Sequence, residues 1–216
     1  MSGKLDQLLS SGIVAVVRKV DADSVVPVVD AFIKGGITGI EITVDSERAY
    51  EKIAELRRLY QEQAVIGAGT VVKTDQAKEA IEAGADFIFA PTLSEEVVKY
   101  TKEQGKIMIP GVFTPTEMYQ AVSWGADVVK IFPASVLGPG FIKDVSAPLG
   151  GIRMMPTGGV NLENVGAFIS AGAEAAGIGG SLVNKTLIKE ENWDELTRIA
   201  KAYVEAVNDA RNNSGK

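Results

Sequence analysis

Residues 25–44 read VVPVVDAFIKGGITGIEITV, and this stretch contains the pattern that decides the fold. Its first half places apolar residues three or four positions apart, which predicts an amphipathic helix. The apolar stripe consists of Val25, Val28, Val29, Phe32 and Ile33. Gly36 is a helix stop signal, and the apolar, β-branched run Gly39–Val44 predicts a buried strand. A helix, a glycine and a strand thus form one short unit.

The same unit recurs along the chain. The strand candidates have centres about 20–26 residues apart, which is the length of one strand–helix unit with short loops. They are Ile13–Arg18, Gly39–Val44, Ala64–Thr70, Phe87–Pro91, Lys106–Val112, Val128–Pro133, Met154–Gly159 and Ala175–Gly180. Strands that alternate with helices predict a parallel sheet. Eight of them favour an α/β fold of the (β/α)8 TIM-barrel type, forming a single domain over residues 1–216.

The alternative fold is an open, doubly wound sheet. It would need a glycine-rich dinucleotide-binding turn after the first strand, and Arg18-Lys19-Val20-Asp21 is not such a turn. Helix boundaries carry their own signals. Thr114-Pro115-Thr116-Glu117 predicts a capping box, and Ser94 and Asn161 are candidate N-caps. Residues 212–216, at the end of the last helical stripe, are expected to be frayed.

Composition excludes several classes of partner. The net charge is −6, with 46% hydrophobic and 23% charged residues, so the chain has no basic surface for nucleic acid or for an anionic membrane. No apolar run reaches the roughly 18–20 residues of a membrane span. The amino terminus lacks the basic and then apolar layout of a secretory signal. A cytoplasmic protein is therefore expected.

The absence of two residue types restricts the chemistry. The sequence contains no cysteine, which excludes thiol catalysis, disulfides and thiolate metal sites. It contains no histidine, which excludes Ser-His triads and the usual zinc ligands. Proton transfer is left to carboxylates, lysine, tyrosine or water. No cluster of Asp and Glu indicates a metal site, and none is expected.

Three charged residues fall in the middle or at the carboxyl end of predicted strands, where barrel enzymes carry out chemistry: Arg18, Glu41 and Lys130. A structural ion-pair network that fills the barrel is one interpretation. The functional interpretation is that burial and the nearby Arg18 lower the pKa of Lys130, while Glu41 opposes that shift. A neutral amine attacks carbonyl carbon, and a nearby carboxylate can transfer the protons. We favour this second interpretation.

Paired glycines end the last two predicted strands. Gly158-Gly159 lies at the end of the seventh strand, and Gly179-Gly180, followed by Ser181, lies at the end of the eighth. Glycines let backbone N–H groups approach an anion closely, and the helices that follow are expected to add positive dipole ends. Barrel enzymes frequently bind phosphate at these two loops. We therefore predict a phosphate site there, with Ser181 adding a hydroxyl donor.

These motifs resemble the 2-keto-3-deoxy-6-phosphogluconate (KDPG) and 4-hydroxy-2-oxoglutarate aldolase family over nearly the whole chain. The resemblance is carried by Ile40–Thr43, Ile66–Thr70, Pro110-Gly111, Lys130–Ala134, Pro156–Val160 and Gly179–Ser181. It implies a homotrimeric, metal-free class I aldolase that needs no cofactor. Such an enzyme cleaves a phosphorylated 2-keto-3-deoxy acid to pyruvate and glyceraldehyde 3-phosphate, or 4-hydroxy-2-oxoglutarate to pyruvate and glyoxylate.

The resemblance also implies residue roles. Lys130 would form the imine, and Glu41 would be the acid and base. Thr70 would hold the pyruvate carboxylate, while Pro91 and Phe132 would line the pocket. The phosphate would lie on Gly158, Gly159, Gly180 and Ser181.

One position departs from the family pattern. Gluconate-type members carry an arginine four residues beyond the catalytic glutamate, and this chain has Asp45 there. Since an aspartate cannot replace a bidentate arginine, Arg18 is the proposed substitute. Three alternatives stay open. They are a 2-dehydro-3-deoxy-6-phosphogalactonate aldolase, a phosphate-binding barrel isomerase, and a non-catalytic sugar-phosphate-binding barrel.

Overall fold

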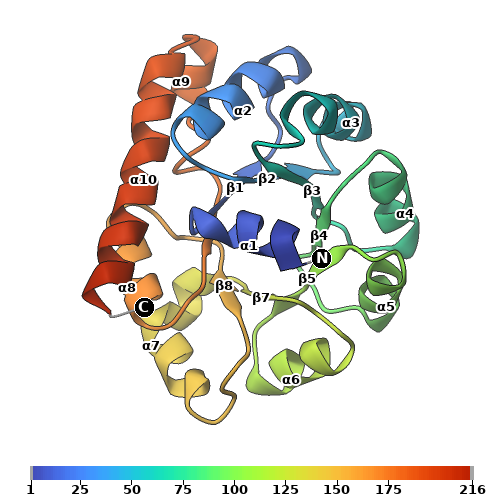
Figure 1. Cartoon of the computed structure of the whole chain (residues 1–216), viewed down its shortest axis with the longest axis vertical. Coiled ribbons are helices and arrows are strands. Elements are labelled where there is room, and N and C mark those ends of the chain that lie inside the picture. The colour runs from blue at the N-terminus through green and yellow to red at the C-terminus, as the bar shows by residue number, and fades with distance from the viewer. Residues whose placement is uncertain (1, 215–216) are drawn as a thin grey trace.

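The computed structural model describes residues 2–214, which form a ring of helices around a closed parallel barrel (Figure 1). The strands are β1 (Ile13–Val17), β2 (Gly39–Thr43), β3 (Val65–Gly69), β4 (Phe87–Phe89), β5 (Ile107–Ile109), β6 (Gly111–Val112), β7 (Val129–Ile131), β8 (Met154–Pro156) and β9 (Ala176–Ile178). The helices are α1 (Ser2–Ser10), η1 (Ala22–Ser24), α2 (Val25–Lys34), α3 (Ala49–Tyr60), α4 (Thr74–Glu82), α5 (Glu95–Glu103), α6 (Pro115–Ser123), α7 (Ala134–Ser146), α8 (Val165–Ser170), α9 (Lys185–Lys189) and α10 (Trp193–Asn213).

The barrel closes through two parallel sheets. One has the order β5-β4-β3-β2-β1-β9 and the other the order β6-β7-β8. β5 and β6 are two parts of the single strand predicted over Lys106–Val112, separated by Pro110, which has no N–H to donate to a neighbouring strand. A bridge between Thr157 and Gly177 joins β8 to β9 and completes the ring. The predicted (β/α)8 barrel is confirmed.

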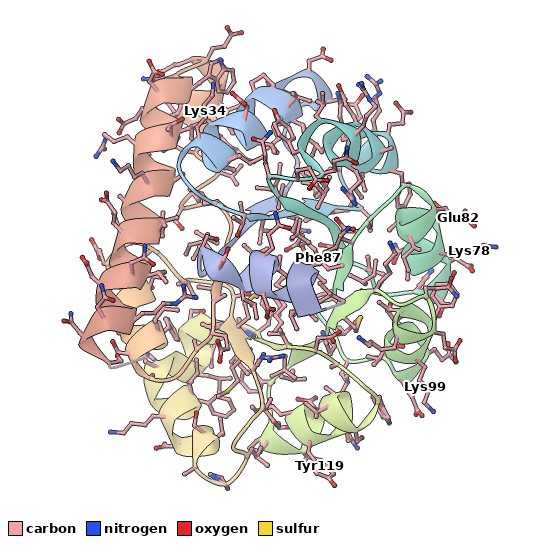
Figure 2. All side chains as sticks on the ribbon, in the orientation of Figure 1. Lys34, Lys78, Glu82, Phe87, Lys99 and Tyr119 are labelled. Atoms are coloured by element: carbon pink, nitrogen blue, oxygen red, sulfur yellow. The ribbon has the colours of Figure 1, made fainter. Side chains whose placement is uncertain are left out.

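Two apolar layers hold the fold together. The larger lies between the strands and the surrounding helices, and the smaller fills the inside of the barrel. Leu5, Leu8 and Leu9 of α1 belong to the inner layer, together with Phe87, which lies near the centre of the ring (Figure 2). α1 therefore covers the amino-terminal end of the barrel. The sequence analysis did not identify this helix.

An ion cluster fixes α1 and α3 to the same end of the barrel. The buried carboxylate of Asp86, just before β4, accepts a hydrogen bond from Lys4. Arg57 Nε of α3 lies 2.9 Å from Asp86 Oδ2, outside hydrogen-bond geometry. This cluster lies at the amino-terminal end of the barrel. The carboxyl-terminal end, where a functional site is expected, is therefore free of it.

The predicted helix boundaries are partly confirmed. Thr114 Oγ1 accepts a hydrogen bond from the Glu117 amide, and Pro115 is the first helical residue, as the capping box requires. Ser94 precedes α5 but makes no side-chain cap. The expectation of a frayed end over 212–216 is wrong for its first residues, because α10 continues to Asn213; residues 215 and 216 lie outside the described range. Among residues 2–214, no helix combines the length and apolarity needed to cross a bilayer.

Candidate active site

A cavity of about 830 Å³ opens at the carboxyl-terminal ends of the strands. That is the end of a barrel where functional residues gather, because the loops that follow the strands meet there. All the predicted site residues line this one cavity. They are Arg18, Glu41, Thr70, Pro91, Lys130, Phe132, Gly158, Gly159, Gly180 and Ser181.

Lys130 is held in β7 between aromatic rings. Its side chain points into the barrel, where the residue is only 6% exposed. The Nζ atom lies 4.3 Å from the centroid of the Phe89 ring and 4.6 Å from that of Phe132. Burial lowers the pKa of the Lys130 ammonium below its ordinary value, with Glu41 opposing the shift and Arg18 adding to it. The amine is therefore more often neutral than an exposed lysine, which makes it a better nucleophile.

Glu41 enters the same cavity from β2, and glycine makes the room for it. Glu41 and Gly69 lie on the inner faces of adjacent strands, and a Cβ atom at position 69 would overlap the Glu41 carboxylate. Glu41 is 1% exposed, and within the described chain its Oε2 atom has no hydrogen-bond partner. Burial raises the pKa of Glu41 to about 7, against the opposing charges of Lys130 and Arg18.

Lys130 and Glu41 form a pair suited to moving protons. No ion pair within 4.0 Å joins them, as judged over residues 2–214. Burial favours the neutral form of both groups, because it lowers the pKa of Lys130 and raises that of Glu41. A neutral amine beside a carboxyl group that titrates near 7 is an arrangement for covalent catalysis with general acid–base assistance.

The mouth of the cavity carries a second charged group. Arg18 Nη2 donates to Asp45 Oδ2 at 2.9 Å, and Lys19 Nζ lies 3.8 Å from the same oxygen. Burial alone would raise the pKa of Asp45, but hydrogen bonds from Thr43 and Arg18 outweigh it and hold that pKa below its usual value. The Lys19 amide donates to Ser46 Oγ at 2.9 Å, which ties the loop after β1 to the loop after β2. Arg18 is thus fixed by an ion pair rather than free.

The two glycine-rich turns face the cavity from β8 and β9. Gly158 and Gly159 have φ values of 88° and 79°, which a residue with a side chain rarely adopts. Across residues 2–214, the amides of Gly159, Val160, Gly180 and Ser181 donate to no protein acceptor. Unpaired amides that line one cavity form an anion-binding cradle. The Ser181 hydroxyl donates to the Val160 carbonyl at 3.1 Å and so links the two turns.

Side chains cap several amides at the starts of the helices that follow these turns, and the contribution of the helix dipoles to an anion site stays a prediction. Asn161 Oδ1 accepts from the amides of Glu163 and Asn164 before α8. Asn184 Oδ1 accepts from the amides of Thr186 and Leu187 at the start of α9. Both sets of amides are already satisfied by side chains, so the cradle consists of the turn residues themselves.

The cavity also contains residues that sequence reasoning missed, including Lys19 and Lys185. Both lie in a loop or at a helix start after a strand, where no alternation pattern indicates the direction of a side chain. Their only sequence signal is their place just beyond a strand end. Metal-ligand chemistry has no evident location: among the described residues, no group of three or more acidic side chains is placed to hold an ion.

Comparison with known proteins gives concordant results. A family model described as KDPG and KHG aldolase matches residues 5–199. The chain is 34% identical over 196 residues to the 2-dehydro-3-deoxy-6-phosphogalactonate aldolase of Escherichia coli (strain K12), which covers 90% of this chain and 96% of that relative. It is 33% identical over 204 residues to the 2-dehydro-3-deoxy-phosphogluconate aldolase of Haemophilus influenzae, with 94% and 96% covered.

A solved structure is similar in the same way. The KDPG aldolase of Legionella pneumophila, with pyruvate captured at low pH as a covalent carbinolamine intermediate, matches with a TM-score of 0.85 at 26% identity. The match covers 91% of this chain and 95% of that chain. Fold, family model and relatives therefore agree over nearly the whole length.

Proposed function

The chain belongs to the KDPG and KHG aldolase family, and from this premise we propose that it cleaves a phosphorylated 2-keto-3-deoxy sugar acid to pyruvate and glyceraldehyde 3-phosphate. The protein is an aldolase and hence a lyase. The observation that carries the proposed chemistry is the buried Lys130 amine, held between two aromatic rings in the same cavity as Glu41.

The reaction begins at Lys130. Its neutral amine attacks the C2 carbonyl of the 2-keto acid and forms a carbinolamine, which loses water to give an iminium ion. Glu41 in its protonated form supplies the proton for the departing hydroxyl. The iminium ion is an electron sink at C2, so the reaction as proposed requires neither metal nor cofactor. Burial of both groups supports this step, because it favours the neutral amine and the neutral carboxyl.

Carbon–carbon cleavage follows. The Glu41 carboxylate removes the proton of the C4 hydroxyl, the C3–C4 bond breaks, and its electron pair moves to C3 to form an enamine on Lys130. The C4 fragment leaves as the aldehyde. Glu41 then returns the proton to C3, and addition of water to the resulting pyruvate imine releases pyruvate and the free amine. One carboxyl group thus serves as base and then as acid, for which a pKa of about 7 is suitable.

Substrate binding is assigned to the ends of the cavity. Thr70 directly follows β3, has a φ of 60°, and is proposed to donate its hydroxyl to the pyruvate carboxylate. Pro91 and Phe132 supply apolar walls around the reacting carbons. The phosphate is proposed to bind the turn of Gly158 and Gly159 together with the turn of Gly180 and Ser181, whose unpaired amides support this placement.

The configuration of the substrate has two candidates. The gluconate-type acid is the first. The galactonate-type acid is the second. The Arg18–Asp45 pair supports it, because Asp45 stands where gluconate-type members of the family carry an arginine. Measurement of kcat/KM for both acids and for 4-hydroxy-2-oxoglutarate decides between them. A preference of at least about tenfold for one acid would correspond to roughly 1.4 kcal/mol of difference in transition-state binding.

We further propose a homotrimer in the cytoplasm. Large apolar side chains are exposed on and beside α6, namely Phe113, Tyr119 and Val122, and Tyr119 is 66% exposed and projects away from the barrel (Figure 2). Such side chains suit an interface between copies of the chain. Phosphorylated sugar acids do not cross a bilayer unaided, which supports a cytoplasmic location for an enzyme that uses them. Light scattering after gel filtration measures the oligomer.

The test of the mechanism is borohydride trapping. We expect incubation with pyruvate and borohydride to add a reduced pyruvyl group to Lys130, located by peptide mass spectrometry. Lys130→Ala should show no adduct, whereas Lys102→Ala, which removes a lysine outside the cavity, should be labelled like the unaltered protein. A folded protein without an adduct would remove the imine mechanism and leave the phosphate-binding barrel alternatives.

A further inference from the structure

We infer that Lys185 supplies the positive charge that selects a phosphorylated substrate over one without a phosphate. This inference rests on the proposed function and adds a binding residue to it. Lys185 lines the cavity together with the two glycine-rich turns, and it is the first residue of α9. The cradle formed by those turns donates only through neutral groups, which hold a dianion weakly unless a cation is also present.

The other cations of the cavity are already occupied. Arg18 and Lys19 both lie beside the carboxylate of Asp45, which offsets one of their two positive charges. Lys130 is buried against aromatic rings and acts in its neutral form. Lys185 differs from these three, because no carboxylate within the described chain lies at ion-pairing distance from it.

The backbone around Lys185 is fixed, which leaves its side chain as the available donor. Asn184 Oδ1 accepts hydrogen bonds from the amides of Thr186 and Leu187 at 3.0 and 3.2 Å. Ile188 is buried in the core one turn further along α9. The short helix is therefore anchored at both ends, and the amides of Thr186 and Leu187 are already paired. What this segment offers to an anion is the ammonium group of Lys185.

The consequence for specificity follows from charge. A phosphate monoester carries about two negative charges at neutral pH. Charge-assisted hydrogen bonds are roughly twice as strong as neutral ones. A long, exposed lysine can reach the anion as it enters and stay in contact with solvent, so it contributes to affinity for the phosphate and not to the bond-breaking step. Loss of Lys185 should therefore act through KM.

The first experiment compares two substrates. For Lys185→Met, which keeps the length and apolar stem of the side chain, we expect KM for the phosphorylated acid to rise at least about tenfold. The ratio of kcat/KM for the phosphorylated acid to that for 4-hydroxy-2-oxoglutarate should fall by a similar factor. Lys185→Arg should restore most of the ratio. Lys189→Met, at the other end of α9 and outside the cavity, should leave it unchanged.

The second experiment does not need catalysis. Binding of inorganic phosphate is measured by calorimetry on the unaltered protein, Lys185→Met and Lys189→Met. A dissociation constant about tenfold larger for Lys185→Met alone supports the inference. A shallower dependence of that constant on salt concentration supports it too. Equal constants for all three proteins, or an unchanged substrate ratio, would overturn it. Failure of the proposed function appears separately, as loss of the borohydride adduct with phosphate binding retained.

Discussion

The carboxylate of Glu41 occupies space that only a glycine at position 69 leaves open. The two residues lie on adjacent parallel strands. Glu41 is on β2, and Gly69 is on β3, where it pairs with Thr43 of β2. A side chain at position 69 would overlap the carboxylate. The glycine therefore determines where the carboxylate that we propose to transfer protons lies relative to Lys130, although it carries no chemistry of its own.

Gly69→Ala should displace the Glu41 carboxylate and lower kcat at least about tenfold, because general acid–base catalysis depends on geometry and contributes roughly 10²–10⁴-fold. The pyruvate adduct on Lys130 should still form. Steady-state kinetics and borohydride trapping measure the two effects. Gly140→Ala is the control, since a Cβ there meets nothing within 4 Å. Unchanged kcat in Gly69→Ala would show that the position of Glu41 is not critical.

The rate should depend on the ionisation of Glu41. Loss of the C2 hydroxyl requires protonated Glu41 in the free enzyme, and this step leaves the carboxylate that then removes the C4 proton. With a pKa of about 7, we therefore expect kcat/KM to fall above neutral pH, approaching tenfold per pH unit. The lowered pKa of Lys130 makes its neutral amine more available than that of an exposed lysine. Glu41→Gln should lower kcat by about 10²-fold or more and abolish the inflection near pH 7. An inflection that persists in this variant would assign it to another group.

Burial of Glu41 should also be visible in stability. The ordinary pKa of a glutamate side chain is 4.5, whereas the pKa of Glu41 in the fold is about 7, so the folded protein binds more protons between these values. The free energy of unfolding should therefore fall as the pH rises from 4.5 to 7, by up to about 3 kcal/mol at roughly 1.4 kcal/mol per pKa unit. Denaturant titrations at pH 5 and pH 8 should show this fall reduced in Glu41→Gln. Parallel pH profiles would contradict it.

Arg18 should contribute to binding of the 2-keto acid. Arg18→Ala is expected to raise the KM for pyruvate in the condensation direction about tenfold, with a smaller effect on kcat, because it removes a charged donor from the cavity mouth. Arg48→Ala provides the control, as Arg48 pairs with Glu51 on the outer surface. If the KM stays constant, Arg18 does not replace the arginine missing at Asp45.

The opposite end of the barrel should affect stability alone. Asp86→Ala leaves the partly buried Arg57 without its carboxylate and releases Lys4 of α1, so we expect a loss of about 3 kcal/mol in the free energy of unfolding. Activity at a temperature where the variant is folded should be retained. Glu95→Ala breaks an exposed pair with Lys99 and should change stability by less than about 1 kcal/mol. A large loss of kcat in Asp86→Ala would contradict this division.

The strands and the shared cavity of Glu41 and Lys130 could be predicted because both leave periodic traces in the sequence. A charged residue inside an apolar run, as at Glu41 and Lys130, is costly to bury and so stands out from the alternation around it. The glycine-rich turns were predictable for a related reason, since Gly158 and Gly159 need positive φ values. These signals lie within short stretches of sequence, so they can be recognised without knowledge of the fold.

The rest depends on contacts between distant segments. α1 covers the barrel because Leu5, Leu8 and Leu9 meet side chains from several strands, which its short apolar pattern alone did not reveal. The pairing of Arg18 with Asp45 joins two loops 27 residues apart. Lys185 enters the cavity only because Asn184 and Ile188 orient a short helix. None of these follows from spacing along the chain.

The way in which the barrel closes affects how the protein unfolds. β8 and β9 meet through the bridge of Thr157 with Gly177, and the two glycine-rich turns begin immediately beyond it. An anion bound by both turns would cross-link the two sides of this seam. Amide hydrogen exchange near Thr157 and Gly177 should then slow when phosphate is present, and mechanical unfolding should begin elsewhere. The phosphate group of the substrate would therefore also stabilise the closed barrel reversibly.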